Sequence, residues 1–344
     1  MKRLVSCIML TLLMAGMIFI AVDIKRASAT AVIVYINSDG SISPVSAPIS
    51  SYDDVIYTLT GNISYPAYAG IVVARSNIVL NGNGFTVQGN QTSPGGNGID
   101  LTDTNNVTIK NTVIQYFDYG IYLMNSNREW IIQNNATSNT YDGITLDSSS
   151  SYNSVTGNIV TANTNGISVY SSSNNIIAGN YAAGNGYGIY VSSSSNVSIV
   201  GNTAIASNVS GIYLYSSSNN TIMSNNITAS LSAASILLYS SSNNLLGGNT
   251  VISSNVGIEL TYSSSYNRVE DNTAASNHYG VWLYVSSNYN TIIGNNVTSN
   301  TIYGIYLVNL SSSIIYNNNF INNTSQTGLS NSANTWDNGY PSGG

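Results

Sequence analysis

The chain has 344 residues, of which only 6% are charged, whereas an average soluble protein carries about 25% charged residues. After residue 30, four basic residues stand against thirteen acidic ones, which leaves a net charge near −9. This balance excludes nucleic acid as a partner and argues against electrostatic attraction to acidic polysaccharide or anionic lipid.

The N-terminus has the pattern of a secretory signal. Lys2 and Arg3 precede an apolar run from Leu4 to Val22, and the small residues Ala27 to Ala29 follow. Signal peptides show this order, so we predict one over residues 1–29. The apolar run is long, which leaves an uncleaved membrane anchor as the alternative and as the only expected membrane contact. We expect the rest of the chain to be secreted, at the cell surface, or in the cell envelope (the periplasm, in a host with two membranes).

Residues 30–68 do not repeat, although the segments 31–36 and 52–59 have the composition of short strands. A stack of repeated strands exposes unpaired strand edges at an open end. We therefore expect residues 30–68 to be a lead segment that caps the N-terminal end of the repeat region.

A Gly-Ile-x-Leu unit then recurs every 22 to 24 residues. It starts at Gly98, Gly120, Gly143, Gly166, Gly188, Gly211, Ser235, Gly257, Gly280 and Gly304, with a fading copy at Gly328. Apolar and polar residues alternate within each unit, as in a strand, and no later window has helical periodicity. One coil cannot bury its apolar face alone, but stacked coils can. The sequence predicts an all-β, single-stranded right-handed parallel β-helix of about ten to eleven coils over residues 69–327, with residues 328–344 as a C-terminal tail.

An asparagine keeps the same phase as the glycine unit and follows an inward aliphatic residue by three positions. The predicted series is Asn135, Asn158, Asn180, Asn202, Asn225, Asn249, Asn272, Asn295 and Asn318. Asparagine tolerates the left-handed conformation of tight corners and can bond the turn backbone. Repeated in every coil, the amides are expected to stack into a structural ladder.

Aromatic residues recur at the outward positions of the Gly-Ile-x-Leu-x strand. The predicted binding residues are Tyr190, Tyr213, Tyr215, Tyr239, Trp282, Tyr284 and Tyr306. Sugar rings lie well on aromatic faces, and a large exposed aromatic patch marks a binding surface. The alternative is that tyrosine simply suits strands and stacking between coils.

The positions of the acidic residues in the repeat give little support for a catalytic site. Asp147 and Glu259 have no acidic partner in phase, and adjacent residues such as Glu270 and Asp271 point to opposite faces of a strand. Two mixed clusters, Arg128-Glu129 and Arg268-Glu270, are expected to be solvated ion pairs. The sequence therefore predicts no catalytic residue, and we expect a protein that is not an enzyme.

No metal site or cofactor is expected either. Copper prefers histidine, cysteine or clustered methionine ligands. Beyond residue 30 the chain offers His278, no cysteine, and the isolated Met124 and Met223.

Three segments resemble a known family. The opening Asn77–Gly84, together with Asn318–Thr324 and Asn334–Gly344 near the end, resembles the NosD-type periplasmic copper-binding β-helix family, within the pectin-lyase-like right-handed β-helix group. The resemblance covers roughly residues 50–344. It implies an exported surface or periplasmic protein with carbohydrate-binding or sugar-hydrolase-like ancestry. The copper in the family name comes from a role in maturing a copper enzyme.

Together these patterns predict an exported, non-catalytic β-helix that binds a polysaccharide, another glycan or a second surface protein through its aromatic face. Two alternatives remain open. One is a polysaccharide-active lyase or hydrolase of the same fold, and the other is an accessory protein for copper-enzyme maturation.

Overall fold

The computed structural model describes residues 33–64, 69–230 and 232–337. The chain divides into two compact units, residues 1–30 and 31–344, and all described residues belong to the second. The predicted signal peptide lies outside the described residues. In the described part every regular element is a strand, and no helix there is long and apolar enough to cross a membrane.

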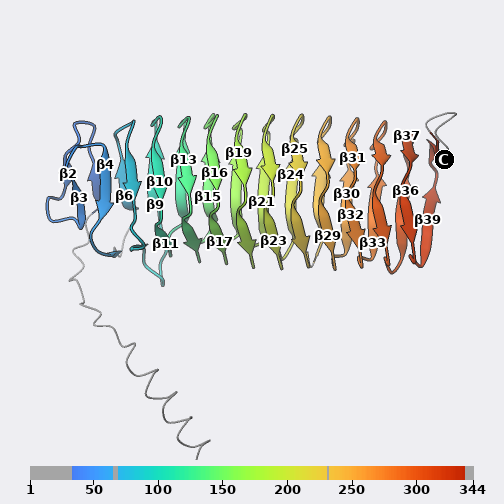
Figure 1. Cartoon of the computed structure of the whole chain (residues 1–344), viewed down its shortest axis with the longest axis horizontal. Helices are drawn as coiled ribbons and strands as arrows, with labels where there is room; N and C mark the ends of the chain where they lie inside the picture. Colours follow the sequence, from blue (N-terminus) through green and yellow to red (C-terminus); the bar gives the residue numbers. More distant parts are fainter. Residues whose placement is uncertain (1–32, 65–68, 231, 338–344) are drawn as a thin grey trace, which may run out of the picture. The chain divides into compact units, whose positions relative to one another are not determined.

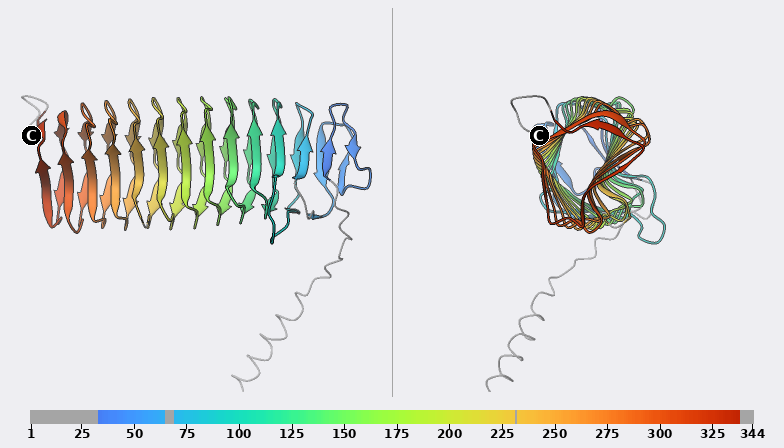
Figure 2. Two further views of the ribbon diagram at one scale, coloured as in Figure 1. Left: turned by 180° about the vertical axis from the view of Figure 1, so that it is seen from behind. Right: turned by 90° about the vertical axis from the view of Figure 1, so that its right-hand side faces the viewer.

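The strands form three long sheets, and each coil contributes one strand to each sheet. Figure 1 shows the coils stacked in chain order, and the axial view in Figure 2 shows the sheets surrounding a common interior. The third sheet has twelve strands, which gives a right-handed parallel β-helix of about twelve turns. The predicted fold is confirmed, and the expected ten to eleven coils are close to this number.

The first sheet has fourteen strands, and each strand from β9 onward has six residues. In spatial order they are β2 (Ile42–Ser43), β1 (Val34–Ile36), β6 (Ala69–Val73), β9 (Asn97–Thr102), β12 (Tyr119–Met124), β15 (Asp142–Asp147), β18 (Asn165–Tyr170), β21 (Tyr187–Ser192), β24 (Ser210–Tyr215), β27 (Ala234–Tyr239), β30 (Val256–Thr261), β33 (Tyr279–Tyr284), β36 (Tyr303–Val308) and β39 (Ser325–Ser330).

The second sheet also has fourteen strands, most of them three residues long. They are β3 (Ile49–Ser51), β4 (Ile56–Leu59), β7 (Val79–Asn81), β10 (Thr108–Lys110), β13 (Trp130–Ile132), β16 (Ser154–Thr156), β19 (Ile176–Ala178), β22 (Ser198–Val200), β25 (Thr221–Met223), β28 (Leu245–Gly247), β31 (Arg268–Glu270), β34 (Thr291–Ile293), β37 (Ser311–Tyr316) and β40 (Ala333–Thr335).

The third sheet completes each coil with another short strand. Its members are β5 (Ile63–Ser64), β8 (Thr86–Gln88), β11 (Val113–Gln115), β14 (Asn135–Thr137), β17 (Ile159–Thr161), β20 (Tyr181–Ala183), β23 (Thr203–Ile205), β26 (Asn226–Thr228), β29 (Thr250–Ile252), β32 (Thr273–Ala275), β35 (Asn296–Thr298) and β38 (Asn319–Ile321).

The segments expected to flank the β-helix also contribute strands to it. Strands β1, β4 and β5, from the lead segment 30–68, pair in parallel with β6, β7 and β8. Strands β2 and β3 turn back antiparallel at the N-terminal edge of the first and second sheets. At the other end, β40 lies in the segment 328–344 and pairs with β37.

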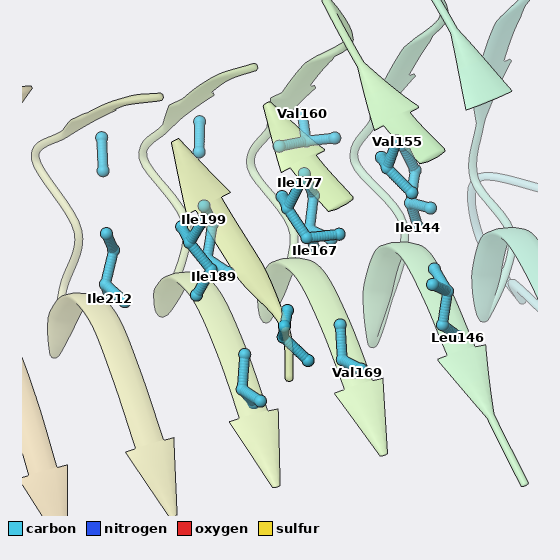
Figure 3. Packing of buried hydrophobic residues seen from close by; sticks show 14 of the residues in the cluster. Ile144, Leu146, Val155, Val160, Ile167, Val169, Ile177, Ile189, Ile199 and Ile212 are labelled. Carbon is cyan, nitrogen blue, oxygen red and sulfur yellow. The ribbon is translucent and has the colours of Figure 1, made fainter. Parts of the chain in front are cut away.

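Inward aliphatic side chains fill the interior. In one coil these are Ile144 and Leu146 from the first sheet, Val155 from the second and Val160 from the third, all with 0% exposure. Figure 3 shows them beside their counterparts from the next coils. Burying each such side chain contributes about 1.5–3 kcal/mol, which is why the inward pattern fixes the fold.

The recurrent glycine provides room rather than a special dihedral angle. A Cβ on Gly166 would lie 2.5 Å from the carbonyl oxygen of Gly188 in the next coil. The backbones of neighbouring coils approach closely there, and any side chain would force them apart.

The asparagine series stacks in the interior, but its first member is Asn134 and not the predicted Asn135. Asn134 Nδ2 donates to Asn158 Oδ1 at 3.1 Å and to the Ile109 carbonyl at 2.9 Å. Asn135 instead begins β14, where its buried Oδ1 has no hydrogen-bond partner. The prediction counted three residues from Ile132, whereas the inward residue is Ile131.

The remaining members follow one another from coil to coil. The backbone N–H of each donates to the Oδ1 of the next at 2.9–3.0 Å, through Asn158, Asn180, Asn202, Asn225, Asn249, Asn272, Asn295 and Asn318. Each buried corner amide is thereby satisfied by the neighbouring coil, as buried polar groups require.

A second ladder of buried corner side chains begins with a glutamate, where the following coil has an asparagine. Glu129 has 0% exposure, and its backbone N–H donates to Asn153 Oδ1 at 2.7 Å. Its carboxylate accepts from the Val107 N–H and from Thr104 Oγ1. Burial raises the pKa of Glu129 to about 7. The expected solvated ion pair between Arg128 and Glu129 is therefore wrong, whereas Arg268 and Glu270 do form one.

Candidate functional site: the tyrosine face

The outward side of the first sheet carries most of the chemistry-bearing side chains. Positions one, four and six of each six-residue strand point outward, while positions three and five hold the buried aliphatic pair. We define the tyrosine face as these outward positions in strands β9 to β36. Neighbouring strands place equal positions in register, so the outward residues form three columns along the axis.

Rings from neighbouring strands contact one another in the middle of the face. Tyr187 and Tyr213 stack with centroids 5.4 Å apart, and Tyr190 lies 5.3 Å from Tyr213. Tyr215 and Tyr239 stack at 5.4 Å. All four predicted residues of this part, Tyr190, Tyr213, Tyr215 and Tyr239, thus belong to one chain of touching rings.

A second ring cluster covers β33 and β36. Trp282 lies 4.9 Å from Tyr284 and 5.7 Å from Tyr306, the three remaining predicted residues. Tyr279 stacks on Trp282 at 4.7 Å, and Tyr303 stacks on Tyr306 at 4.9 Å. At the fourth strand position, Leu237 and Glu259 lie between this cluster and the middle one.

The sequence interpretation missed the first position of each strand. Tyr187, Tyr279 and Tyr303 occupy this position and join the two ring clusters, whereas Tyr119, at the same position, forms a third cluster with Tyr122 and Tyr141. The signal that could have found them is the residue directly before each recurrent glycine.

Several tyrosine hydroxyls on this face have raised pKa values. Burial raises the pKa of Tyr284 to about 12 and also that of Tyr170 to about 12. Burial likewise raises the pKa of Tyr213. At neutral pH these groups offer both a donor and an acceptor to a ligand.

Two carboxylates from β15 lie among the rings near the N-terminal end of the face. Asp142 is only 1% exposed and accepts hydrogen bonds from Asn165 Nδ2 at 2.7 Å and Thr145 Oγ1 at 2.9 Å. Burial raises the pKa of Asp142. Asp147 accepts the Tyr122 hydroxyl at 3.0 Å. This cluster was missed because Asp142, like Tyr187, occupies the first strand position.

A third carboxylate lies beside the second ring cluster. Glu259 is 8% exposed and accepts the Tyr284 hydroxyl at 3.0 Å. Burial raises the pKa of Glu259, and the bond from Tyr284 opposes this change. The neighbouring Trp282 Nε1 is buried and has no hydrogen-bond partner among the described residues. This end of the face therefore has unused polar capacity.

The other acidic candidates lie elsewhere. Glu270 is on the outward side of the second sheet, beside Arg268. Asp271 is in the corner that follows, with a φ of 54°. Neither contributes to the tyrosine face.

The described residues do not fit a resident copper ion. They contain no group of three or more His, Cys, Asp or Glu side chains that could hold a metal. Met124 lies in the first sheet and Met223 in the second, while His278 Nδ1 pairs with Asn255 Oδ1 at 3.1 Å. Copper, which prefers clustered soft or imidazole ligands, finds no such set here.

Solved structures of enzymes share the fold. The A-module of the Azotobacter vinelandii mannuronan C-5 epimerase AlgE6 superposes with a TM-score of 0.64 at 18% identity, covering 84% of this chain and 85% of that one. The AlgE4 A-module of the same organism gives 0.60 at 17% identity, with 84% and 82% covered. DFA-IIIase from Arthrobacter chlorophenolicus A6, in complex with GF2, gives 0.51 at 13% identity, with 80% of each chain covered.

These structures contradict the expectation that the chain is not an enzyme, because the proteins that share its architecture over four fifths of its length are epimerases and a DFA-IIIase. At identities this low the likeness establishes the fold, and the particular reactions stay with those proteins.

No curated protein matches the chain. A family model does: the model described as "Periplasmic copper-binding protein (NosD)" matches residues 35–230 and 205–343. Together the two matches span nearly all of the second unit. The chain therefore belongs to the NosD family of periplasmic copper-binding proteins.

Proposed function

We propose that this protein acts outside the cytoplasm and binds carbohydrate along the tyrosine face. The observation that carries the proposal is the array of touching aromatic rings from Tyr187 to Tyr239 and from Tyr279 to Tyr306. Flat ring faces with hydroxyl groups at their edges suit pyranose rings, which are apolar on their faces and polar around their rims.

The dimensions of the face suit a polymer rather than a single sugar. Nine strands lie between β12 and β36 inclusive, and at a strand spacing of about 4.8 Å they extend over roughly 40 Å. An extended pyranose chain advances by a similar step per residue, so successive sugars can meet successive coils. A family described as periplasmic fits a protein that meets envelope or extracellular glycans.

The test is binding of the full chain to a panel of oligosaccharides, measured by isothermal titration calorimetry. Trp282→Ala and Tyr213→Ala each remove one ring from the face. Tyr181→Ala is the matched control, because Tyr181 is a half-exposed tyrosine on the third sheet. Binding that falls for the first two variants and not for the control supports the proposal; equal binding by all four proteins refutes it.

A second candidate function is sugar modification at Asp142, Asp147 and Tyr122. Two carboxyl groups on one outward face, with a tyrosine hydroxyl bonded to one of them, supply the groups that general acid–base chemistry requires. Incubation of the full chain with polysaccharides, followed by chromatography of the products, tests this candidate. Products that disappear with Asp142→Asn support it, and unchanged polymer in every case rejects it.

A further inference from the structure

The tyrosine face carries acidic side chains and no basic ones. Asp100, Asp142, Asp147 and Glu259 occupy outward positions of β9, β15 and β30. The four basic residues of the described part lie elsewhere. Arg75 and Arg128 are in corners, and Lys110 and Arg268 are on the second sheet. The face therefore presents a negative potential with no cation of its own.

Buried polar side chains lie beneath the rings, beside these carboxylates. Ser168 has 0% exposure and Thr261 1%, both at outward positions, where the Ser168 hydroxyl interacts with Asp142 and Tyr170 and the Thr261 hydroxyl with Tyr284. Ser168 pairs in register with Thr145 at the fourth strand position, next to Asp142. Thr261 lies two residues after Glu259 on the same strand. Beside Glu259, the Nε1 of Trp282 has no hydrogen-bond partner among the described residues.

Two further features favour a cation. Burial raises the pKa values of Asp142 and Glu259, so each carboxylate is short of stabilising positive charge. Aromatic residues lie on one side of Glu259, with Trp282 next to it in register and the Tyr284 hydroxyl bonded to it, while Leu237 lies on the other side. Ring faces attract ammonium groups, most strongly where water is excluded.

We infer that the glycan bound by the tyrosine face carries free amino groups, as in a polymer of non-acetylated hexosamines. This inference rests on the proposed function. The sugar rings would stack on the tyrosines, and the ammonium groups would face Asp147, Glu259 and their neighbours. A polyuronate such as mannuronan would bring carboxylates against carboxylates, which like-charge repulsion opposes. The inference therefore separates this chain from the epimerases that share its fold.

The experiment compares three oligomers of equal length on the full chain by calorimetry at pH 6: glucosamine, N-acetylglucosamine and mannuronate. We expect glucosamine oligomers to bind at least tenfold tighter than the acetylated ones, and mannuronate to bind weakest. Raising the salt concentration should reduce this preference, because it screens the charges at the face.

Two isosteric variants locate the effect. Glu259→Gln and Asp147→Asn keep an acceptor for Tyr284 and Tyr122 but remove the charge. Each should lower the ratio of glucosamine to N-acetylglucosamine affinity severalfold. Glu270→Gln, on the second sheet, is the control and should change neither. Two variants from opposite ends of the face keep the test informative if one of them folds poorly.

The outcomes distinguish the inference from the function on which it rests. Equal binding of free and acetylated oligomers, or tightest binding of mannuronate, overturns the amino-sugar inference while carbohydrate binding stands. If no oligosaccharide binds, the proposed function itself fails, and the inference fails with it.

Discussion

The first and third sheets come from the same repeat, yet their outward sides differ completely. The tyrosine face has three clusters of aromatic rings and four carboxylates. The third sheet, from β8 to β38, has no charged residue and a single aromatic at an outward position, Tyr181. Since both sheets stack equally well, the fold does not require the tyrosines. The difference supports the proposal that the rings bind a ligand.

The largest expected effect comes from removing two rings at once. Truncating an aromatic anchor at a binding surface costs about 2 kcal/mol or more. Tyr213→Ala with Trp282→Ala should therefore weaken glycan binding by about 4 kcal/mol, on the order of a thousandfold. Calorimetry on the double variant checks this value. A double variant that still binds within tenfold of the original chain would show that the rings serve coil stacking only.

Glu129, a buried residue in a corner of its coil, tests whether stability depends on the interior rather than on the outward sides of the sheets. The folded-state pKa of Glu129 is about 7, above its ordinary value of 4.5. Its contribution to stability is therefore complete below pH 4.5 and is lost as the pH rises through 7. The loss between pH 5 and 8 should reach about 3 kcal/mol at most.

Glu129→Gln should remove this pH dependence and stabilise the protein at pH 8. Urea unfolding at pH 5 and pH 8 measures both effects. Glu270→Gln serves as the control, because Glu270 is not buried and pairs with Arg268 outside the core. If the original chain and Glu129→Gln lose stability equally between the two pH values, the protonation of Glu129 is not the cause.

The asparagine ladder gives a smaller effect. Asn202 Oδ1 accepts the backbone N–H of Asn180 at 2.9 Å, and its Nδ2 donates to the Ile177 carbonyl at 2.9 Å. Asn202→Ala leaves these buried groups without partners and should cost about 2 kcal/mol in the free energy of unfolding. Asn226→Ala, at an exposed outward position of β26, is the matched control. Similar losses of unfolding free energy in both variants would show that the ladder bonds do not stabilise the protein specifically.

The smallest effect is expected on the third sheet. Thr250→Ala changes an outward position of β29, and surface substitutions of this kind alter stability by less than about 0.5 kcal/mol. Glycan binding should not change. A loss of binding would place the ligand on the third sheet and reverse the comparison between the two faces.

Much of the architecture could be predicted because the repeat fixes the phase of the inward residues. Ile189 and Val191 alternate with Tyr190 as strand periodicity requires, and both are buried. Alternation fails at the glycine: Tyr187 and Tyr190 are three residues apart, yet their rings lie 5.5 Å from each other on the same side. Because alternation fails at the glycine, the sequence interpretation missed the first outward position of each strand, including Asp142.

The error at Asn135 has a related cause. Both Ile131 and Ile132 are aliphatic, so composition alone cannot tell which one points inward. Glu129 was equally hidden, because a charged residue beside Arg128 has the composition of a solvated pair. Its burial depends on its alignment with Asn153 in the next coil, which the local sequence does not reveal.

The ladder bonds join residues 22 to 24 positions apart, which is one coil length. Interactions along the axis are therefore confined to adjacent turns, and no turn depends on a distant one. Duplicating or deleting one whole repeat in the gene would lengthen or shorten the protein by a single step without disturbing the remaining contacts. On the proposed function, the number of sugar units that the tyrosine face can hold follows from the count of repeats, a property that recombination can adjust in unit increments.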